Sequence, residues 1–339
     1  MITIDQQPPA YCFVSGFGDV VIRSPYPVTM TLRVNSALVL QEKYTPTSGN
    51  YIYIRDLESV LNANINKTVL VSPVTMTLED SDDTKVISVN VQYATANINL
   101  PADIYAETNF LTLLQREKIT IPGQTEYLSL IATEETTVTA KAKYDDGTVH
   151  TITLGTVTVL NRVHTFNASS SRFPNPTRIA HYVVSAGRRA MVFYMYKPPW
   201  ELPQQFVFLN AFGVKETFIP MGLITRENKY TNLFGSFAGK YRKHHVDLVR
   251  EYAANTGVLS RSMADWIEDL FFSKDVFLLN ADNVQTEVTI LDATVKRSST
   301  WSELPAFDFK YRLSNVSQHE YRFEERKRIF DKTFDYTFN

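Results

Sequence analysis

The stretch that decides the fold runs from residue 206 to residue 313 and opens with FVFLNAFGVKETFIP (206–220). It continues through EYAANTGVLSRSMADWIEDLFFSKDVFLL (251–279) and closes with VTILDATVKRSSTWSELPAFDFKYRL (288–313). Branched and aromatic residues are frequent in these segments, and such side chains suit the half-buried surface of a β-sheet. The stretch predicts a large β-rich domain, which we place at residues 177–316.

One segment of this domain has the periodicity of an α-helix. Its apolar residues recur at spacings of three and four and are Met263, Trp266, Ile267, Leu270 and Phe271. Ser262 precedes them as a candidate N-cap, and Asp265 follows three residues later. The pattern predicts one amphipathic helix near residues 262–271. Glu268 and Asp269 fall with Asp265 on its other face, which we expect to be solvated.

The segment KYRKHHVDLVREYAANT (240–256) is compatible with two structures. As a helix it places Tyr241, His245, Leu248 and Tyr252 on one side. As a strand it presents Val246, Leu248, Arg250 and Tyr252 at alternate positions, because side chains repeat every second residue in a strand. We favour the strand.

Residues 1–100 predict a first β-sandwich-like domain. Short runs such as VTMTLRVN (28–35) and KVISVNVQYA (85–94) alternate in polarity and are separated by Pro, Asn, Ser and Gly. The hexapeptide PVTMTL occurs at 27–32 and again at 73–78. It indicates either two equivalent, duplicated strands or a chance match, and we favour chance because the flanking residues do not align.

Residues 101–165 predict a second, smaller β-sandwich-like domain. TTVTAKAKY (136–144) and TVHTITLGTVTVL (148–160) flank Asp145-Asp146-Gly147. Asp-Gly between two alternating runs predicts a β-hairpin, because Gly adopts the positive φ that a primed turn needs. We interpret the two Asp residues as turn residues rather than metal ligands. The polar segment FNASSSRFPNP (166–176) predicts a linker to the third domain.

Composition excludes several classes of protein. The 339 residues are 44% hydrophobic and carry a net charge of −2, which argues against nucleic acid as a main partner. The single cysteine, Cys12, can form no intramolecular disulfide, and we expect a packed thiol. The first residues lack the features of a signal peptide, and no apolar run reaches about 18 residues. We therefore expect a chain made in the cytoplasm with no membrane span.

The sequence shows no established catalytic motif. It has no GxGxxG, P-loop, GxSxG or HExxH pattern. His244 and His245 point to opposite faces of a strand, so we expect no metal site. Glu268 and Asp269 are interpreted as surface carboxylates rather than a glycosidase pair. Trp200 and Trp301 could stack on sugar rings, but we favour packing for both. We expect no enzyme activity and no cofactor.

The last residues, 317–339, form a segment of different character, which we interpret as a C-terminal arm. Seven of the nine residues from 320 to 328 are charged. Aromatic residues follow at Phe330, Phe334, Tyr336 and Phe338, and the last three alternate as one face of an added strand would. A chain terminus seldom keeps aromatic residues unless they dock. We expect these four residues to contact a neighbouring subunit by strand addition or aromatic anchoring, the alternative being a fold-back onto their own domain.

A set of spaced motifs resembles a known group of proteins. LNAFGVKET (209–217), EYAANTG (251–257), WIEDLFFSKDVFL (266–278) and RIFDKTFDYTFN (328–339) are similar to segments of virion proteins encoded by phages and prophages of Bacteroidetes, including crAss-like phages. PPAYCFVSGFGDVVI (8–22) and YIYIRDLESVL (51–61) resemble the start of the same proteins. The resemblance spans most of the chain, and none of its motifs corresponds to a functional site.

The resemblance implies a structural subunit of a tailed-phage particle, in the tail, baseplate or neck. Such proteins commonly stack β-domains into symmetric rings, so the expected partners are further copies of the chain and other phage virion proteins, and the expected location is the virion. The alternative is a receptor- or glycan-binding β-sandwich protein at the tail tip. A cleft with two exposed aromatic rings favours that alternative, and two carboxylates converging in a cleft favour an enzyme such as a glycan depolymerase.

Overall fold

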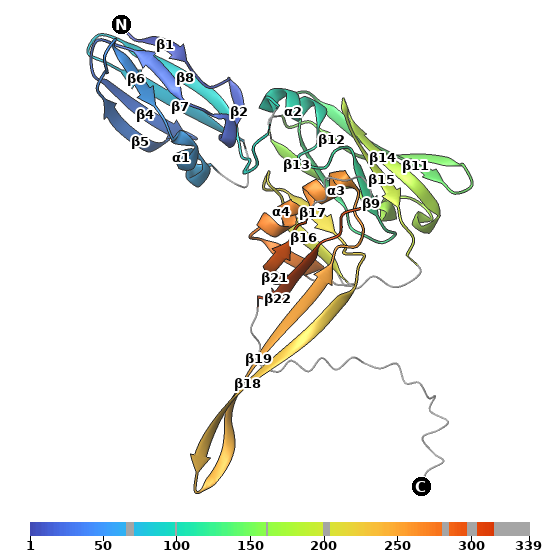
Figure 1. Ribbon diagram of the computed structural model, residues 1–339. Helices are drawn as coiled ribbons and strands as arrows, with labels where there is room; N and C mark the ends of the chain where they lie inside the picture. Colours follow the sequence, from blue (N-terminus) through green and yellow to red (C-terminus); the bar gives the residue numbers. More distant parts are fainter. Residues whose placement is uncertain are drawn as a thin grey trace, which may run out of the picture.

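The computed structural model describes residues 1–65, 71–98, 100–160, 162–198, 204–279, 285–296 and 304–314. Strands form five sheets, and the helices are few and short, so the prediction of a mainly β protein is confirmed. Figure 1 shows a β-sandwich at one end, two further sheet units in the centre, and a long hairpin that projects away from them.

The N-terminal sandwich consists of two sheets over one buried core. A three-stranded sheet has the order β1-β3-β6, and a five-stranded sheet has the order β2-β8-β7-β4-β5. The elements are β1 (Thr3–Gln6), β2 (Tyr11–Phe13), β3 (Val20–Arg23), β4 (Val28–Val34), β5 (Ala37–Tyr44), β6 (Tyr51–Ile54), α1 (Leu57–Asn64), β7 (Val71–Glu79) and β8 (Thr84–Gln92). Alternate residues of β4 and β7 point into the core, as the period of two requires. Cys12 lies in this core with 3% of its surface exposed, as expected.

The two PVTMTL copies lie side by side in this sandwich. They belong to β4 and β7, which pair in antiparallel register with Thr31 opposite Thr77. Thr31 and Thr77 occupy the same position of the hexapeptide, so the pairing is locally symmetric. Both copies bury Val, Met and Leu and turn Thr outward. The two strands are thus equivalent in environment, which a sheet produces wherever neighbouring strands share one buried face.

The middle unit contains a five-stranded sheet of order β12-β11-β14-β15-β9 and a two-stranded sheet of β10 and β13. The elements are α2 (Ala102–Thr108), β9 (Glu117–Thr120), β10 (Tyr127–Ile131), β11 (Thr136–Tyr144), β12 (Val149–Val157), β13 (Val163–Asn167), β14 (Ile179–Ala186) and β15 (Arg189–Met195). The hairpin predicted at Asp145-Asp146-Gly147 joins β11 and β12, and Gly147 has φ +83°.

The expected boundary between the second and third domains is wrong. β14 and β15 lie beyond residue 177, yet they pair with β11 and β9 of the middle sheet. The expected linker is part of the packed unit, because Phe173, Ser169 and Ser170 are buried. Its three Ser and two Pro residues resemble a flexible connection in composition. In the structure, two short 3₁₀ turns begin at Ser170 and at Pro176.

The third unit is a seven-stranded sheet of order β17-β16-β20-β21-β22-β19-β18. Its elements are β16 (Gln205–Leu209), β17 (Lys215–Phe218), β18 (Ile224–Phe237), β19 (Lys240–Asn255), α3 (Arg261–Trp266), α4 (Glu268–Phe272), β20 (Val276–Leu279), β21 (Gln285–Thr294) and β22 (Asp308–Leu313). The strand favoured for 240–256 is therefore confirmed. The middle and third units share one continuous buried core.

The predicted amphipathic helix is present, but two of its details are corrected. Ile267 separates α3 from α4, and the N-cap is Ser260, whose Oγ accepts a hydrogen bond from the amide of Met263. Ser262 Oγ instead accepts a hydrogen bond from the amide of Gln115. The apolar stripe faces the core, as expected, with Trp266, Ile267 and Leu270 fully buried. Asp269 is buried as well and is not part of a solvated face.

Candidate interaction surface

The hairpin of β18 and β19 extends far beyond the sheet to which it belongs. β19 pairs with β22 only over residues 252–255, whereas β18 and β19 pair with each other along their full lengths. Residues 227–251 therefore form a two-stranded ribbon with no third strand beside it among the described residues. We call this part the outer ribbon, and Figure 1 shows it projecting from the body.

One face of the outer ribbon carries three exposed aromatic rings. Tyr230, Phe234 and Tyr241 are 58%, 51% and 76% exposed, and we call this set the aromatic face. The rings of Phe234 and Tyr241 stack with centroids 5.2 Å apart and planes 10° from parallel. Ile224 occupies the same side of β18 and packs on the core, because residues at even spacing share a face. The aromatic face thus continues the buried side of the sheet into solvent.

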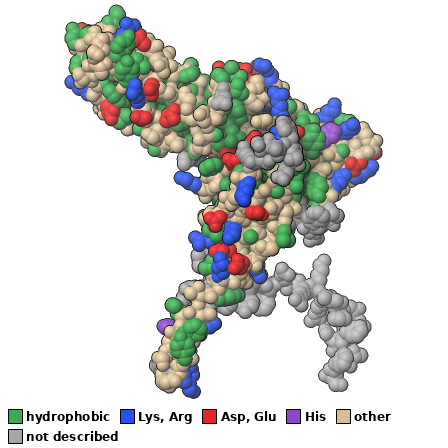
Figure 2. Space-filling model, viewed as in Figure 1, with side chains coloured by type: hydrophobic (Ala, Val, Ile, Leu, Met, Phe, Trp, Pro, Cys, Tyr) green, Lys and Arg blue, Asp and Glu red, His purple; other side chains and the backbone are tan. Residues whose placement is uncertain are grey.

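The outer ribbon is also basic. Residues 228–246 contain four Lys or Arg residues and no Asp or Glu, whereas the rest of the chain holds 30 Lys and Arg against all 36 Asp and Glu. Figure 2 shows hydrophobic and basic side chains on the projecting hairpin. Lys229 pairs with Glu251 at 2.6 Å, and Lys240, Arg242 and Lys243 are exposed. Such a surface favours an acidic partner that also offers apolar contact.

Elementary energetics make the outer ribbon a candidate interaction surface. A two-stranded hairpin alone is marginally stable in water, because it buries little apolar surface. Exposed aromatic rings gathered on one face mark an interaction site more often than an ordinary surface. Tyr and Phe are also among the residues that interfaces enrich. The geometry of the outer ribbon therefore supports binding.

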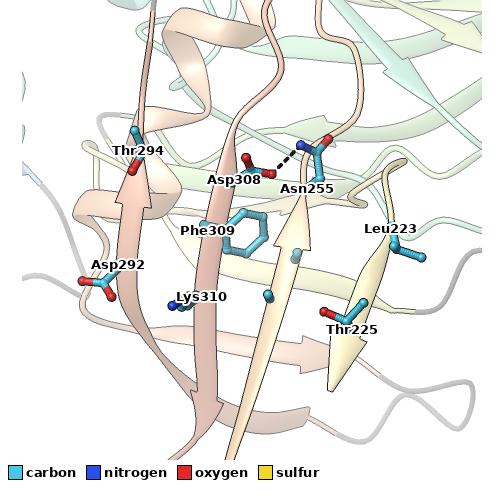
Figure 3. Close-up of a pocket in the computed structure, with 10 residues that line it drawn as sticks. Leu223, Thr225, Asn255, Asp292, Thr294, Asp308, Phe309 and Lys310 are labelled. Atoms are coloured by element: carbon cyan, nitrogen blue, oxygen red, sulfur yellow. Dashed lines mark hydrogen bonds between the residues drawn. The ribbon is translucent and has the colours of Figure 1, made fainter. Parts of the chain in front are cut away.

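A shallow hollow of about 300 Å³ lies at the base of the hairpin. Asp292 stands opposite Lys310 across β21 and β22, and Thr294 stands opposite Asp308. Figure 3 shows these residues and the 2.6 Å hydrogen bond that Asn255 Nδ2 donates to Asp308. Each carboxylate thus has a basic or amide group beside it. The arrangement is that of a polar sheet surface in which opposite charges face one another.

A second group of charged residues is enclosed between the middle and third units. Lys118 Nζ lies 2.5 Å from Glu126 Oε2 and donates to the backbone oxygen of Thr217. Trp266 Nε1 donates to Glu216 Oε2 at 2.5 Å, and the Lys118 ammonium lies 5.0 Å from the Trp266 ring centre. All four charged or aromatic side chains are buried. The cluster joins the two units and is closed to a substrate.

Burial shifts the ionisation of two carboxyl groups beside this cluster. Desolvation raises the pKa of Glu216 from 4.5 to about 7, although hydrogen bonds from Thr112 and Trp266 act in the opposite direction. Desolvation likewise raises the pKa of Asp269 to about 6, against a hydrogen bond from the Ala211 amide. This burial could not be predicted from the sequence, because each residue is an acidic position beside apolar ones.

Three units meet at one aromatic ring. Phe212 lies in the turn between β16 and β17 and is fully buried. Its ring centre is 5.9 Å from that of Phe13 in the N-terminal sandwich and 5.2 Å from that of Tyr105 in α2. The amide of Thr95 also donates to the Ala211 carbonyl at 2.8 Å. These contacts attach the sandwich to the rest of the molecule.

Several of the site residues considered in the sequence analysis lie outside the described part of the chain. The expected interface residues Phe330, Phe334, Tyr336 and Phe338 lie outside the described residues, as do Trp200 and Trp301. His244 is exposed at a bulge of β19, where the register shifts between Leu233 and Phe234. The aromatic face of the outer ribbon was not predicted from the sequence. The sequence signal was the placing of Tyr230 and Phe234 at even-numbered positions before the turn at Ala238 and Gly239, and of Tyr241 after it, opposite Ser236.

Two kinds of feature are absent from the described residues. No group of three or more His, Cys, Asp or Glu in this part of the chain is arranged to hold a metal ion. None of the helices described is long and apolar enough to cross a membrane.

Comparisons with known proteins identify no family. No protein-family model matches the chain, and no curated protein matches it. Among solved structures, a tandem of titin immunoglobulin domains is 10% identical, covering 58% of this chain and 97% of its own, with a TM-score of 0.22. Three N-terminal domains of the highly immunogenic outer capsid protein (Hoc) of bacteriophage RB49 are 10% identical, covering 58% and 70%, with a TM-score of 0.17. The four N-terminal immunoglobulin domains of Dscam1 are 8% identical, covering 87% and 80%, with a TM-score of 0.20. At such low scores none of these likenesses carries an argument about function.

Proposed function

We propose that this chain is a non-enzymatic structural subunit of a tailed-phage particle, in the tail, baseplate or neck. It assembles with copies of itself through surfaces of its β-domains and through its C-terminal arm, residues 317–339. The observation that carries the proposal is the outer ribbon, whose aromatic face extends the core side of a sheet into solvent. The resemblance of the spaced sequence motifs to Bacteroidetes phage virion proteins is the reason for proposing a phage particle.

The interior supports a structural role. Lys118 and Glu126 of the middle unit hydrogen-bond to Thr217 of the third unit, and Phe212 of the third unit contacts Phe13 of the N-terminal sandwich. A subunit of a large assembly needs such rigid connections, because its contacts must keep a fixed direction from one copy to the next.

Sedimentation velocity tests the proposal. We expect the full-length protein to form a defined oligomer at micromolar concentration. We expect a variant whose residues 230–248 are replaced by a short Asn-Gly turn to fall toward the monomer. The control is truncation after residue 317, which tests the arm separately. A full-length protein that stays monomeric at every concentration contradicts self-assembly.

The phage setting needs its own measurement. Antibodies against the purified protein, applied to particles from a culture that carries the gene, are expected to label a fixed place on the tail or neck by electron microscopy. Labelled tailless material, or labelling confined to the cell interior, contradicts this part of the proposal.

One observation favours the second candidate, a receptor- or glycan-binding protein at the tail tip. Phe272 is 80% exposed beside a hollow of about 520 Å³ that Glu268 and Phe271 also line. An exposed ring next to a carboxylate suits a sugar, whose apolar face stacks and whose hydroxyls donate. Binding of cell-surface polysaccharide by the wild type but not by Phe272→Ala, with unchanged oligomeric state, supports this candidate.

A further inference from the structure

We infer that the outer ribbon of one copy packs against the N-terminal sandwich of a second copy, so that the chains join head to tail. The inference rests on the proposed self-assembly and names the two surfaces that meet. Three observations lead to it: the aromatic face, the basic charge of the ribbon, and the position of the acidic sandwich at the opposite end of the molecule (Figure 1).

A second copy is the occupant that the charges favour. Residues 228–246 of the outer ribbon carry four Lys or Arg and no Asp or Glu, whereas the remainder of the same chain has an acidic surplus. Nucleic acid is less suited, because Lys229 is already paired with Glu251 and few phosphate contacts remain. The stacked pair of Phe234 and Tyr241 also offers an apolar surface, which a protein face can cover.

The N-terminal sandwich is the acidic region that faces away from the ribbon. Residues 1–100 hold nine Asp or Glu and six Lys or Arg. The turn between β7 and β8 lies beside the N-terminus, since the Ile2 amide donates to Asp83 at 2.9 Å. Asp80 and Asp83 accept backbone hydrogen bonds there, which leaves the exposed Glu79 and Asp82 to face a partner. Val86, 58% exposed, supplies an apolar contact in the same strand pair.

The contact must join different surfaces rather than like surfaces. Two ribbons placed tip to tip bring positive charges together, and juxtaposed like charges oppose association. A contact between a ribbon and a sandwich leaves a free sandwich on one copy and a free ribbon on the other. Such heterologous contacts close into a ring when the rotation per copy permits and otherwise continue as a filament.

Charge reversal on each side tests this pairing. The ribbon variant carries Lys240→Glu, Arg242→Glu and Lys243→Glu, and the sandwich variant carries Glu79→Lys and Asp82→Lys. All five positions are exposed, so we expect both variants to fold. Each variant alone is expected to associate at least about tenfold more weakly than the wild type, because its own two surfaces then repel.

The decisive sample is a one-to-one mixture of the two variants. The acidic ribbon of one then meets the basic sandwich of the other, and each unmodified ribbon meets an unmodified sandwich. We expect the mixture to regain the oligomer size of the wild type, measured by sedimentation velocity in low salt. A chain that carries all five substitutions is expected to regain it as well.

The outcomes separate this inference from the proposed function. If the wild type associates and the charge variants associate equally well, or if their mixture stays dissociated, the head-to-tail pairing is overturned while self-assembly stands. If the wild type never associates, self-assembly itself is contradicted and the pairing falls with it. Loss of a DNA mobility shift in the ribbon variant, with unchanged oligomer size, overturns the pairing in favour of nucleic acid.

Discussion

Two hairpins at opposite edges of the same seven-stranded sheet differ in whether their aromatic rings are buried. β16 and β17 form one edge, and the ring in their turn, Phe212, is fully buried between Phe13 and Tyr105. β18 and β19 form the other edge, and their rings Phe234 and Tyr241 are 51% and 76% exposed. Both hairpins present aromatic residues and turn at a Gly with φ near +70°.

The difference lies in whether residues of the same chain cover the ring of each hairpin. The ring of the first is covered by residues of the same chain that are more than a hundred positions away. The second has no such cover among the described residues, and its rings stay exposed. A hairpin's sequence therefore specifies its turn and its faces, whereas the burial of its rings depends on contacts with distant segments.

The largest effect is expected at the buried ring. Phe212→Ala should lower the free energy of unfolding by about 3–5 kcal/mol, because it removes apolar contact and leaves a cavity where three units meet. Urea unfolding followed by fluorescence measures the change. Phe234→Ala in the outer ribbon is the matched control and should change the unfolding free energy by less than about 0.5 kcal/mol. Equal losses in the two variants contradict the contrast.

The second effect concerns pH. Glu216, in the buried hairpin, has its pKa raised to about 7 in the folded state, so the folded protein holds a proton that the unfolded chain releases above about pH 4.5. Stability should therefore fall as pH rises from 5 to 8, by up to about 3 kcal/mol from this group. Glu216→Gln should flatten the decline, measured by urea unfolding across that range.

Glu251 in the outer ribbon is the control for this measurement. The neighbouring Lys229 holds the pKa of its carboxyl below the usual value, so it stays ionised in both states above pH 5. Glu251→Gln should leave the pH dependence as in the wild type. A wild-type stability that rises between pH 5 and 8 contradicts the role assigned to Glu216.

A smaller effect distinguishes the two turns. Gly213 and Gly239 have φ of +72° and +73°, a region that disfavours Ala by roughly 1 kcal/mol. Gly213→Ala should lower global stability by that amount, because its hairpin unfolds with the core. Gly239→Ala should loosen only the ribbon, seen as faster amide hydrogen exchange at residues 228–249 with little change in global unfolding.

The smallest change in stability is expected at the aromatic face. Phe234→Ser combined with Tyr241→Ser should alter the unfolding free energy by less than about 0.5 kcal/mol, because exposed rings lose little contact. The same double variant should weaken self-association, measured by light scattering over a concentration series. Leu38→Ser, at an exposed position of the sandwich strand β5, is the control. Unchanged association in the double variant contradicts a role for the ribbon.

Local physical chemistry was readable from the sequence by itself. Alternation identified the strands, Asp145-Asp146-Gly147 identified a hairpin, and the stripe through Trp266 and Leu270 identified a helix that faces the core. These signals are local because they depend on backbone conformation and on a period of two or 3.6 residues. The mainly β class followed from them.

Only the tertiary structure decided which side chains are buried and which residue caps the helix. Ser260 rather than Ser262 caps the helix, because Ser262 is engaged by the amide of Gln115, which lies far away in sequence. Phe173 is buried in a segment whose polar composition predicted a linker, and Asp269 is buried on a helix face that read as solvated. Coverage of Phe212 and exposure of Phe234 depend on contacts between distant segments, and composition and periodicity carry no information about such contacts.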